Sequence, residues 1–142
     1  MRNVSQIIDR KGSQVVSVTR QSPVLEAIRV MAEHHIGAVL VMEGPQLIGI
    51  ASERDYARKV ILQGRSSHDT PVATIMSSPV VCVGPHDSVA ECMSIMTEKH
   101  IRHLPVIDGE RVVGVVSIGD LVKEMLEEQK AEISLLQQYI AG

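Results

Sequence analysis

The sequence predicts an α/β fold of the α+β kind, built from two copies of one βαββα unit, and three observations support it. First, an offset of 65 aligns residues 15–60 with residues 80–125 without a gap, and 14 of the 46 pairs are identical. Second, each copy carries valine-rich runs typical of strands, and third, each carries apolar residues at helical spacing. A unit of about 45 residues with so few strands cannot bury its own apolar faces, so the copies are expected to pair about a pseudo-two-fold axis.

Each copy is expected to open with a strand, V-V-S-V at residues 15–18 and V-V-C-V at residues 80–83, because β-branched residues favour pleated strands. A helix follows, with Ser22 suited to the N-cap and Pro23 to the first helical position, and with Asp87 in the capping place of the second copy. The apolar residues that give each helix a sheet-facing side are Val24, Ile28 and Met31, matched by Val89, Met93 and Met96.

A β-hairpin is predicted next in each copy. Its strands cover residues 38–42 and 47–51 around the turn E-G-P-Q, and residues 104–107 and 112–116 around the turn D-G-E-R. A second helix then starts at Ser52 or at Ser117. Residues 61–76 are rich in turn-forming residues and are interpreted as the connector between the copies.

The predicted organisation is one module over residues 1–142, with the first repeat at 8–62, the second at 72–126 and an extra C-terminal helix at 127–142. In this last helix Ile133, Leu136 and Ile140 form an apolar stripe that lies outside the repeat. Two interpretations are equally open: the helix folds back on the domain, or it contacts another subunit.

Composition and charge argue against several kinds of partner. With only two aromatic residues, Tyr56 and Tyr139, and a net charge of −3, the chain offers little that would stack bases or attract a polyanion, so no nucleic acid is expected. No apolar run has the length of a signal peptide core or a membrane span, which predicts a cytoplasmic protein with no membrane partner. Cys82 and Cys92 lack a C-x-x-C spacing and are expected to be reduced core thiols.

The sharpest local pattern is G-I-A-S-E-R-D at residues 49–55, echoed by G-V-V-S-I-G-D at residues 114–120. One interpretation is a capping box, in which the serine caps a helix and the acidic residue reaches back to the helix start. The other is a ligand site, in which the aspartate accepts hydrogen bonds from a ribose diol while the serine hydroxyl and the free N–H groups face phosphates. The motif glycine would let another group approach the strand backbone closely.

The repeat, the hairpins, both motifs and K-H-I-R-H-L-P-V-I-D at residues 99–108 resemble the cystathionine β-synthase (CBS) domain, which occurs in tandem pairs, over about residues 11–123. The resemblance implies a disc-like module whose two clefts between the repeats bind AMP, ADP, ATP, NAD or S-adenosylmethionine, with no catalytic cofactor. Carried over by position, Asp55 and Asp120 are the expected ribose ligands, and Ser52 and Ser117 lie near ribose or phosphate. The expected adenine pockets comprise Gly12, Ser13, Gln14, Val15, Ile36, Gly37 and Ala38 in the first copy, and Ser77, Ser78, Pro79, Val80 and Ile101 in the second.

The two copies differ where phosphates would lie. Arg102 and His103 match the basic pair that many members of this family point at phosphate, whereas the first copy has Gly37 and Ala38 there. The first copy instead offers Arg54, one place before its aspartate. The planar guanidinium fork of Arg54 or Arg102 suits bidentate phosphate contacts, and a solvated surface charge is the alternative for each.

Neither a metal centre nor a catalytic centre is expected. The four candidate histidines lack acidic or cysteine ligands at useful spacing; they are His34, His35, His100 and His103. No nucleophile stands beside a base, and the motif aspartates, Asp55 and Asp120, are each single in their copies. The sequence therefore predicts a regulatory or sensor module, homodimeric, that binds an adenosine nucleotide and changes its shape or its association with an unknown effector protein. The alternative is a constitutive dimerisation and assembly module with vestigial clefts.

Overall fold

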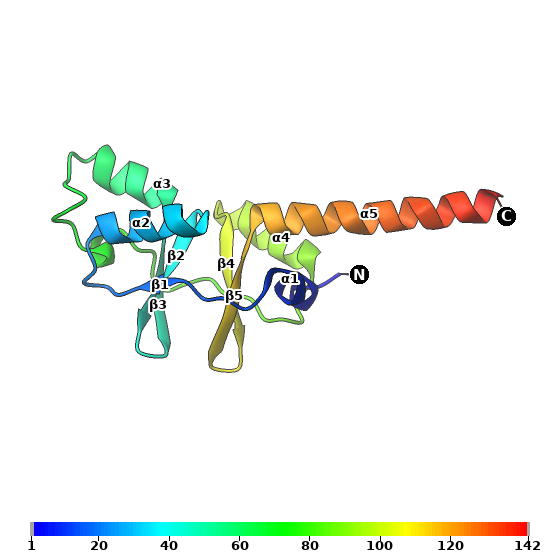
Figure 1. Cartoon of the computed structure of the whole chain (residues 1–142), viewed down its shortest axis with the longest axis horizontal. Coiled ribbons are helices and arrows are strands. Elements are labelled where there is room, and N and C mark those ends of the chain that lie inside the picture. The colour runs from blue at the N-terminus through cyan, green and yellow to red at the C-terminus, as the bar shows by residue number, and fades with distance from the viewer. Residues whose placement is uncertain (1, 142) are drawn as a thin grey trace. The chain divides into compact units, whose positions relative to one another are not determined.

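The computed structural model of the protein describes residues 2–141, and the chain divides into two compact units (Figure 1). The central unit contains residues 15–81, and the terminal unit contains residues 2–14 together with 82–141. The chain therefore passes from one unit to the other twice. Each unit combines the hairpin of one repeat with the segment that precedes the first strand of the other repeat.

The central unit is built on a three-stranded sheet in the order β1-β2-β3. Strand β1 (Ser17–Val18) pairs parallel with β2 (Ala38–Glu43), which forms an antiparallel hairpin with β3 (Gln46–Ser52). Helix α2 (Val24–His34) separates β1 from β2, and the short α3 (Glu53–Tyr56) continues into a π-helical turn, Ala57–Ile61. A 3-10 turn, Val72–Thr74, returns the chain to the core of this unit.

The core of the central unit is aliphatic and includes residues from both ends of the segment. Val72 and Ile75, which precede the first strand of the second repeat, are fully buried in this core. Its buried members are Val18, Val24, Ala27, Met31, Val39, Val41, Ala51, Val60, Val72 and Ile75. Burying a side chain of this size contributes about 1.5–3 kcal/mol, so the leading segment of the second repeat helps to stabilise the hairpin of the first.

The terminal unit repeats this arrangement around a two-stranded sheet, with a helix in place of the 3-10 turn and a longer helix after the hairpin. Helix α4 (Val89–Lys99) precedes the antiparallel hairpin β4 (His103–Asp108) and β5 (Arg111–Ser117), and α5 (Ile118–Ala141) follows it. The N-terminal helix α1 (Val4–Lys11) contacts both β5 and α5. The buried apolar residues of this unit occupy positions that largely match those of the central unit; they are Val4, Ile7, Val83, Val89, Cys92, Met96, Leu104, Val106, Val116 and Leu121.

A buried carboxylate joins α1 to α5. Glu124 has only 2% of its side chain exposed, and it receives Arg2 Nη1 at 2.7 Å on Oε1 and Arg10 Nη1 at 3.0 Å on Oε2. A buried charge is tolerated only when it is paired and hydrogen-bonded. The position of α1 on the second hairpin is thus specified by charge as well as by the burial of Val4 and Ile7.

The predicted first strands are shorter than expected. Regular pairing is limited to Ser17–Val18 in the first copy, and the second copy has an isolated bridge between Val83 and Val106. In the second copy the reason is a missing donor: in the first copy the Leu40 N–H bonds to the Val16 carbonyl at 3.2 Å, but the second copy has Pro105 at the position of Leu40. Proline has no N–H with which to extend the ladder.

Both predicted N-caps are displaced by one residue. In the first copy Pro23, not Ser22, is the N-cap, and the Ser22 hydroxyl instead accepts the Thr19 N–H at 3.1 Å. In the second copy Ser88 caps α4 by accepting the Glu91 N–H at 3.0 Å. Asp87 closes the preceding turn, with its carboxylate on the Gly84 N–H at 2.7 Å.

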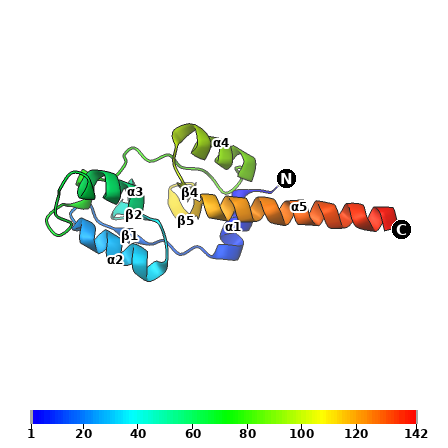
Figure 2. The same ribbon diagram turned by 90° about the horizontal axis from the view of Figure 1, so that it is seen from above.

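The second helix of the second copy and the C-terminal helix form one continuous helix. Helix α5 runs without a break from Ile118 to Ala141 and extends past α1 and α4 in both views (Figures 1 and 2). Residues 129–141 are exposed along their whole length, so the fold-back interpretation was wrong. Within residues 2–141 no helix combines the length and the hydropathy of a bilayer span.

Candidate functional site

Both Gly-h-h-Ser-x-x-Asp motifs (h for a hydrophobic residue) lie where a hairpin strand ends and a helix begins. In the central unit the Ser52 hydroxyl accepts the Asp55 N–H at 3.2 Å, and the Asp55 Oδ2 accepts the Ser52 N–H at 2.9 Å and the Ser52 hydroxyl at 3.0 Å. The capping interpretation is therefore correct for this motif. It uses only one carboxylate oxygen, and the second oxygen, Oδ1, lies 3.5 Å from Lys59 Nζ.

The two hydrogen bonds of this capping box that involve backbone N–H groups recur in the terminal unit, with one addition. The Ser117 hydroxyl accepts the Asp120 N–H at 3.1 Å, and the Asp120 Oδ2 accepts the Ser117 N–H at 2.8 Å. The addition is Lys11, whose Nζ lies 2.7 Å from the same Oδ2 and donates to the Val115 carbonyl at 2.9 Å. The Asp120 Oδ1 accepts no hydrogen bond from the part of the chain that the structure describes.

The charges around Asp120 shift two titrations. Burial raises the pKa of Asp120, but the hydrogen bonds from Lys11 and Ser117 and the Lys11 charge outweigh burial, so the pKa lies below its ordinary value of 3.8. Burial lowers the pKa of His103 below 6.5, and the charges of Lys11 and Arg102 lower it further against the opposing charge of Asp120. At neutral pH the carboxylate is therefore charged and the imidazole neutral.

The predicted phosphate-binding residues flank these motifs unequally. His103 pairs across the hairpin with Ser117, and the Arg102 carbonyl accepts the Ile118 N–H at 2.9 Å. In the central unit the Gly37 carbonyl likewise accepts the Glu53 N–H at 3.0 Å. Arg102 is exposed and Arg54 is half-buried, and neither forms an ion pair within residues 2–141.

The segments predicted to hold adenine are divided between the units. Gly12, Ser13, Gln14 and Ile101 belong to the terminal unit, whereas Val15, Ile36–Ala38 and residues 77–80 belong to the central unit. Ser77 exchanges two backbone hydrogen bonds with Ile50 of β3, at 2.9 and 3.2 Å. Ile36 and Gly37 line a groove of about 480 Å³ within the central unit, together with Ile28, Met31, Ala32, His35, Glu53 and Tyr56.

The motif glycines are required by protein side chains. A Cβ on Gly49 would lie 2.6 Å from Met76 Sδ, and one on Gly114 would lie 2.7 Å from Ile8 Cδ1. Both partners come from the segment that precedes the first strand of a repeat. The close approach predicted from the sequence is therefore present, and its partners are side chains of this chain.

Lys11 and Lys59 were not among the predicted site residues. Lys59 could have been found, because it follows Asp55 at the (i, i+4) spacing that brings helical side chains together. Lys11 carries no such signal: it precedes the aligned residues, and its counterpart at the same offset is Met76. Its contact with Asp120 depends on the packing of α1 against β5.

Within residues 2–141 no three histidine, cysteine or acidic side chains gather in a way that could hold a metal ion. His35 and His100 end α2 and α4 instead, each in the left-handed region, with φ values of 54° and 56°.

Comparison with known proteins identifies the family. The sequence pattern of the CBS domain matches this chain twice, over residues 4–61 and 72–127. The chain belongs to the CBS domain family. It is a tandem CBS protein with a long C-terminal helix.

Two relatives are similar over nearly their whole length. A CBS-domain protein from Burkholderia ambifaria, whose name proposes a role in signal transduction, is 48% identical with a TM-score of 0.86, and the match covers 89% of this chain and 96% of that one. The CBS domain-containing protein YhcV of Bacillus subtilis is 33% identical over 132 residues, covering 93% of this chain and 94% of YhcV.

A third protein shares the fold. The CBS domain pair of MJ0100, solved in complex with 5′-methylthioadenosine and S-adenosylmethionine, is 22% identical with a TM-score of 0.79 and covers 90% of this chain and 98% of that one.

Proposed function

We propose that this tandem CBS protein is a regulatory module, without catalysis of its own, that binds adenosine-containing nucleotides through Asp55 and Asp120. One observation carries the proposal: each motif aspartate caps its helix with Oδ2 and keeps Oδ1 outside the capping box. A carboxylate has about four acceptor sites on its two oxygens. Helix capping and ribose binding are therefore compatible roles for one side chain.

Two further observations support an adenosine ligand. The MJ0100 domain pair has the same fold and binds two adenosine compounds. The motif serine Ser117 stands at the start of α5, a helix of 24 residues whose positive dipole end favours anions, although the Ile118 and Asp120 N–H groups there are bonded within the chain. The remaining expected ligands, AMP, ADP, ATP and NAD, share the ribose and the adenine that the motifs are proposed to recognise.

The test is thermal unfolding of the protein with AMP, ADP, ATP, NAD, NADH or S-adenosylmethionine, with GMP as the control. A ligand that binds the native state stabilises it by RT ln(1 + [L]/Kd), about 2.7 kcal/mol at a hundredfold excess over Kd. We expect adenosine ligands to raise the midpoint and GMP to leave it unchanged. No shift at millimolar concentrations of any adenosine ligand would refute the proposal.

Asp55→Asn and Asp120→Asn are the matched variants. Asparagine keeps a side-chain oxygen that can accept the serine N–H, so the helix cap is largely retained. The substitution removes the negative charge of the carboxylate that is proposed to accept hydrogen bonds from the ribose hydroxyls. Hydrogen bonds to a charged group contribute about 1.5–3 kcal/mol, so each variant should weaken its own site about ten- to a hundredfold. Each variant should unfold within a few degrees of the unmodified protein in the absence of ligand.

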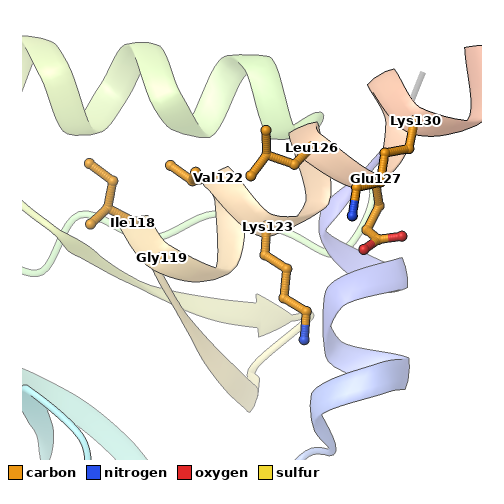
Figure 3. A pocket seen from close by; sticks show the side chains of 7 residues that line it. All are labelled: Ile118, Gly119, Val122, Lys123, Leu126, Glu127 and Lys130. Atoms are coloured by element: carbon orange, nitrogen blue, oxygen red, sulfur yellow. The ribbon is translucent and has the colours of Figure 1, made fainter. Parts of the chain in front are cut away.

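A second candidate function, assembly of the protein through α5, is favoured by a specific surface. Five apolar side chains form a line along α5, here called the α5 stripe: Val122, Leu126, Ile133, Leu136 and Ile140. Their spacing alternates between four and three residues once the polar Gln129 is counted. All five apolar side chains are exposed, from 42% to 83%. Near its start, Ile118, Val122 and Leu126 line a groove of about 590 Å³ whose other lining residues include Lys123, Glu127 and Lys130 (Figure 3).

We propose that a second copy of α5 covers the α5 stripe. The spacing is that of a coiled-coil seam, with the polar Gln129 at one seam position, where a polar residue sets the register. From Ile133 to Ala141 the helix carries no charged residue, so burying this half removes no charge from water. Sedimentation equilibrium should show a dimer for the protein and a monomer for Leu136→Glu, with the exposed Gln138→Glu as the control. A monomeric unmodified protein at high micromolar concentration would exclude this assembly.

A further inference from the structure

Lys11 places a cation directly on the carboxylate that is proposed to bind ribose. Its Nζ lies 2.7 Å from the Asp120 Oδ2 and donates to the Val115 carbonyl at 2.9 Å, so two acceptors on separate elements fix it. The Lys11 side chain is 40% exposed and the Asp120 side chain 25% exposed. The ammonium therefore lies at the accessible edge of the site, where a ligand would meet it.

The central unit lacks a cation in this position. At the same repeat offset Lys11 is replaced by Met76, whose side chain packs on Gly49. Asp55 has only Lys59, from its own helical segment, at 3.5 Å. That lysine also donates to the Ile75 carbonyl at 3.0 Å, which holds it against its own unit.

The two motif sites consequently differ in where their cations come from. Around Asp120 the terminal unit brings Lys11 from α1, and Arg102 and His103 from the start of the second hairpin, whereas the central unit has Gly37 and Ala38 at these hairpin positions and supplies Arg54 and Lys59 from the chain on either side of Asp55. With the imidazole neutral, Lys11 and Arg102 together exceed the single charge of Asp120 by one. A ligand that binds the free Asp120 Oδ1 thus enters a site with excess positive charge.

We propose that Lys11 is a specificity-determining residue, and that it makes the Asp120 site select adenosine 5′-phosphates over uncharged or cationic adenosine compounds such as S-adenosylmethionine. The inference rests on the proposed function and narrows the ligand class at one of its two sites. Lysine binds phosphate oxygens as a point charge and Arg102 adds a planar fork. The same positive charges repel the sulfonium of S-adenosylmethionine and add nothing to the affinity for neutral adenosine.

The experiment measures the affinities of AMP, adenosine and S-adenosylmethionine by titration calorimetry in a protein that carries Asp55→Asn, which weakens the other site. Lys11→Met reproduces the residue at the equivalent position of the first repeat, and Lys11→Arg is the control that keeps the charge. We expect AMP to bind at least about tenfold more tightly than adenosine in the parent. Lys11→Met should lower that ratio about tenfold and improve binding of S-adenosylmethionine, and Lys11→Arg should preserve the ratio.

A second measurement needs no variant. Because exposed charges are screened by salt, raising the ionic strength should weaken AMP binding to the unmodified protein and leave adenosine binding nearly constant. If Lys11→Met leaves the ratio of AMP to adenosine affinity unchanged, or if AMP binding does not respond to salt, Lys11 does not select phosphate. If no adenosine compound, ADP, ATP and NAD included, binds the unmodified protein, the proposed function itself fails, and that result is distinct from the first.

Discussion

The paired glycines of the two motifs allow one mutation to be made twice, in two surroundings of known geometry. Replacing Gly49 with alanine brings the new Cβ within 2.6 Å of Met76 Sδ, 3.0 Å of its Cγ and 3.2 Å of its Cβ. Replacing Gly114 brings it within 2.7 Å of Ile8 Cδ1, and the next atom, Cγ1, is 3.8 Å away. The first clash involves most of a side chain, and the second involves one terminal methyl group.

The two costs follow from this difference. Overpacking a filled core costs about 1–3 kcal/mol, whereas alanine is favoured over glycine in a strand by about 0.5–1 kcal/mol. Rotation of the terminal methyl group of Ile8 should keep the overpacking cost of Gly114→Ala at about 1 kcal/mol, the lower limit. The preference for alanine in a strand then brings the net change in unfolding free energy close to zero. Met76 cannot retreat without moving its Cβ, so Gly49→Ala should lose about 2 kcal/mol, or roughly 4–8 °C in the unfolding midpoint for a chain of this size.

Urea unfolding followed by circular dichroism measures both changes. Gly84→Ala is the neutral reference, because its Cβ would meet only the Ile107 carbonyl at 3.7 Å and an Asp87 oxygen at 3.8 Å. Met76→Ala should cost less in the Gly49→Ala background than alone, since the two changes relieve each other. Equal losses from Gly49→Ala and Gly114→Ala would refute the reasoning and mean that the glycines serve something other than these contacts.

Three further results are expected. His100→Gly should raise the unfolding free energy by up to about 1 kcal/mol, because His100 lies in the left-handed region, which costs a residue with a side chain about 1–2 kcal/mol, and the greater flexibility of glycine in the unfolded chain offsets part of this gain. His100→Val should lower the unfolding free energy, and a valine variant more stable than the glycine variant would disprove the strain. Burial and the charges of Asp87 and Glu91 raise the pKa of Cys92 to about 11, so in Cys82→Ala protein the remaining thiol should react with Ellman's reagent only after urea is added; rapid reaction of the native protein would contradict this. The pKa of Asp120 is lowered in the folded protein, so the stabilisation that its charge provides is complete at pH values above 3.8 and is lost as the pH falls below that value. The difference in unfolding free energy between the protein and Asp120→Asn should therefore shrink on acidification. A constant difference would show that the ion pair with Lys11 contributes nothing.

The repeat made most of the fold predictable. Strands and helices recur at one offset, and the hairpins and both Ser-x-x-Asp helix starts were found within a residue or two of their observed ends. The sequence motif alone could not show that helix capping and ligand binding are compatible. In the structure the capping bond occupies only one of the two oxygens of the Asp120 carboxylate. The roles of Asp55 and Asp120 in binding stay predictions.

What the sequence did not reveal depends on contacts between distant segments. The effect of Pro105 on the first strand of its repeat becomes visible only once the Leu40 to Val16 bond shows which donor is missing. Lys11 reaches Asp120 across 109 positions of the chain, and no local spacing encodes that. The observed N-caps lie one residue after the predicted ones, because the side chains of Ser22 and Asp87 accept the Thr19 and Gly84 N–H groups of their own turns instead.

The double passage of the chain between the units bears on how such a protein could arise by duplication. A solitary ancestral repeat would contain a hairpin and a leading segment, but here each leading segment completes the core beside the other repeat's hairpin: Ile8 fills the space at Gly114, and Met76 the space at Gly49. Two ancestral copies would then have exchanged their leading segments, as in a swapped dimer, before fusion made the exchange intramolecular. Cutting the present chain between its sequence repeats, near residue 67, should leave two fragments that fold only when mixed, whereas residues 15–81 retain a complete core.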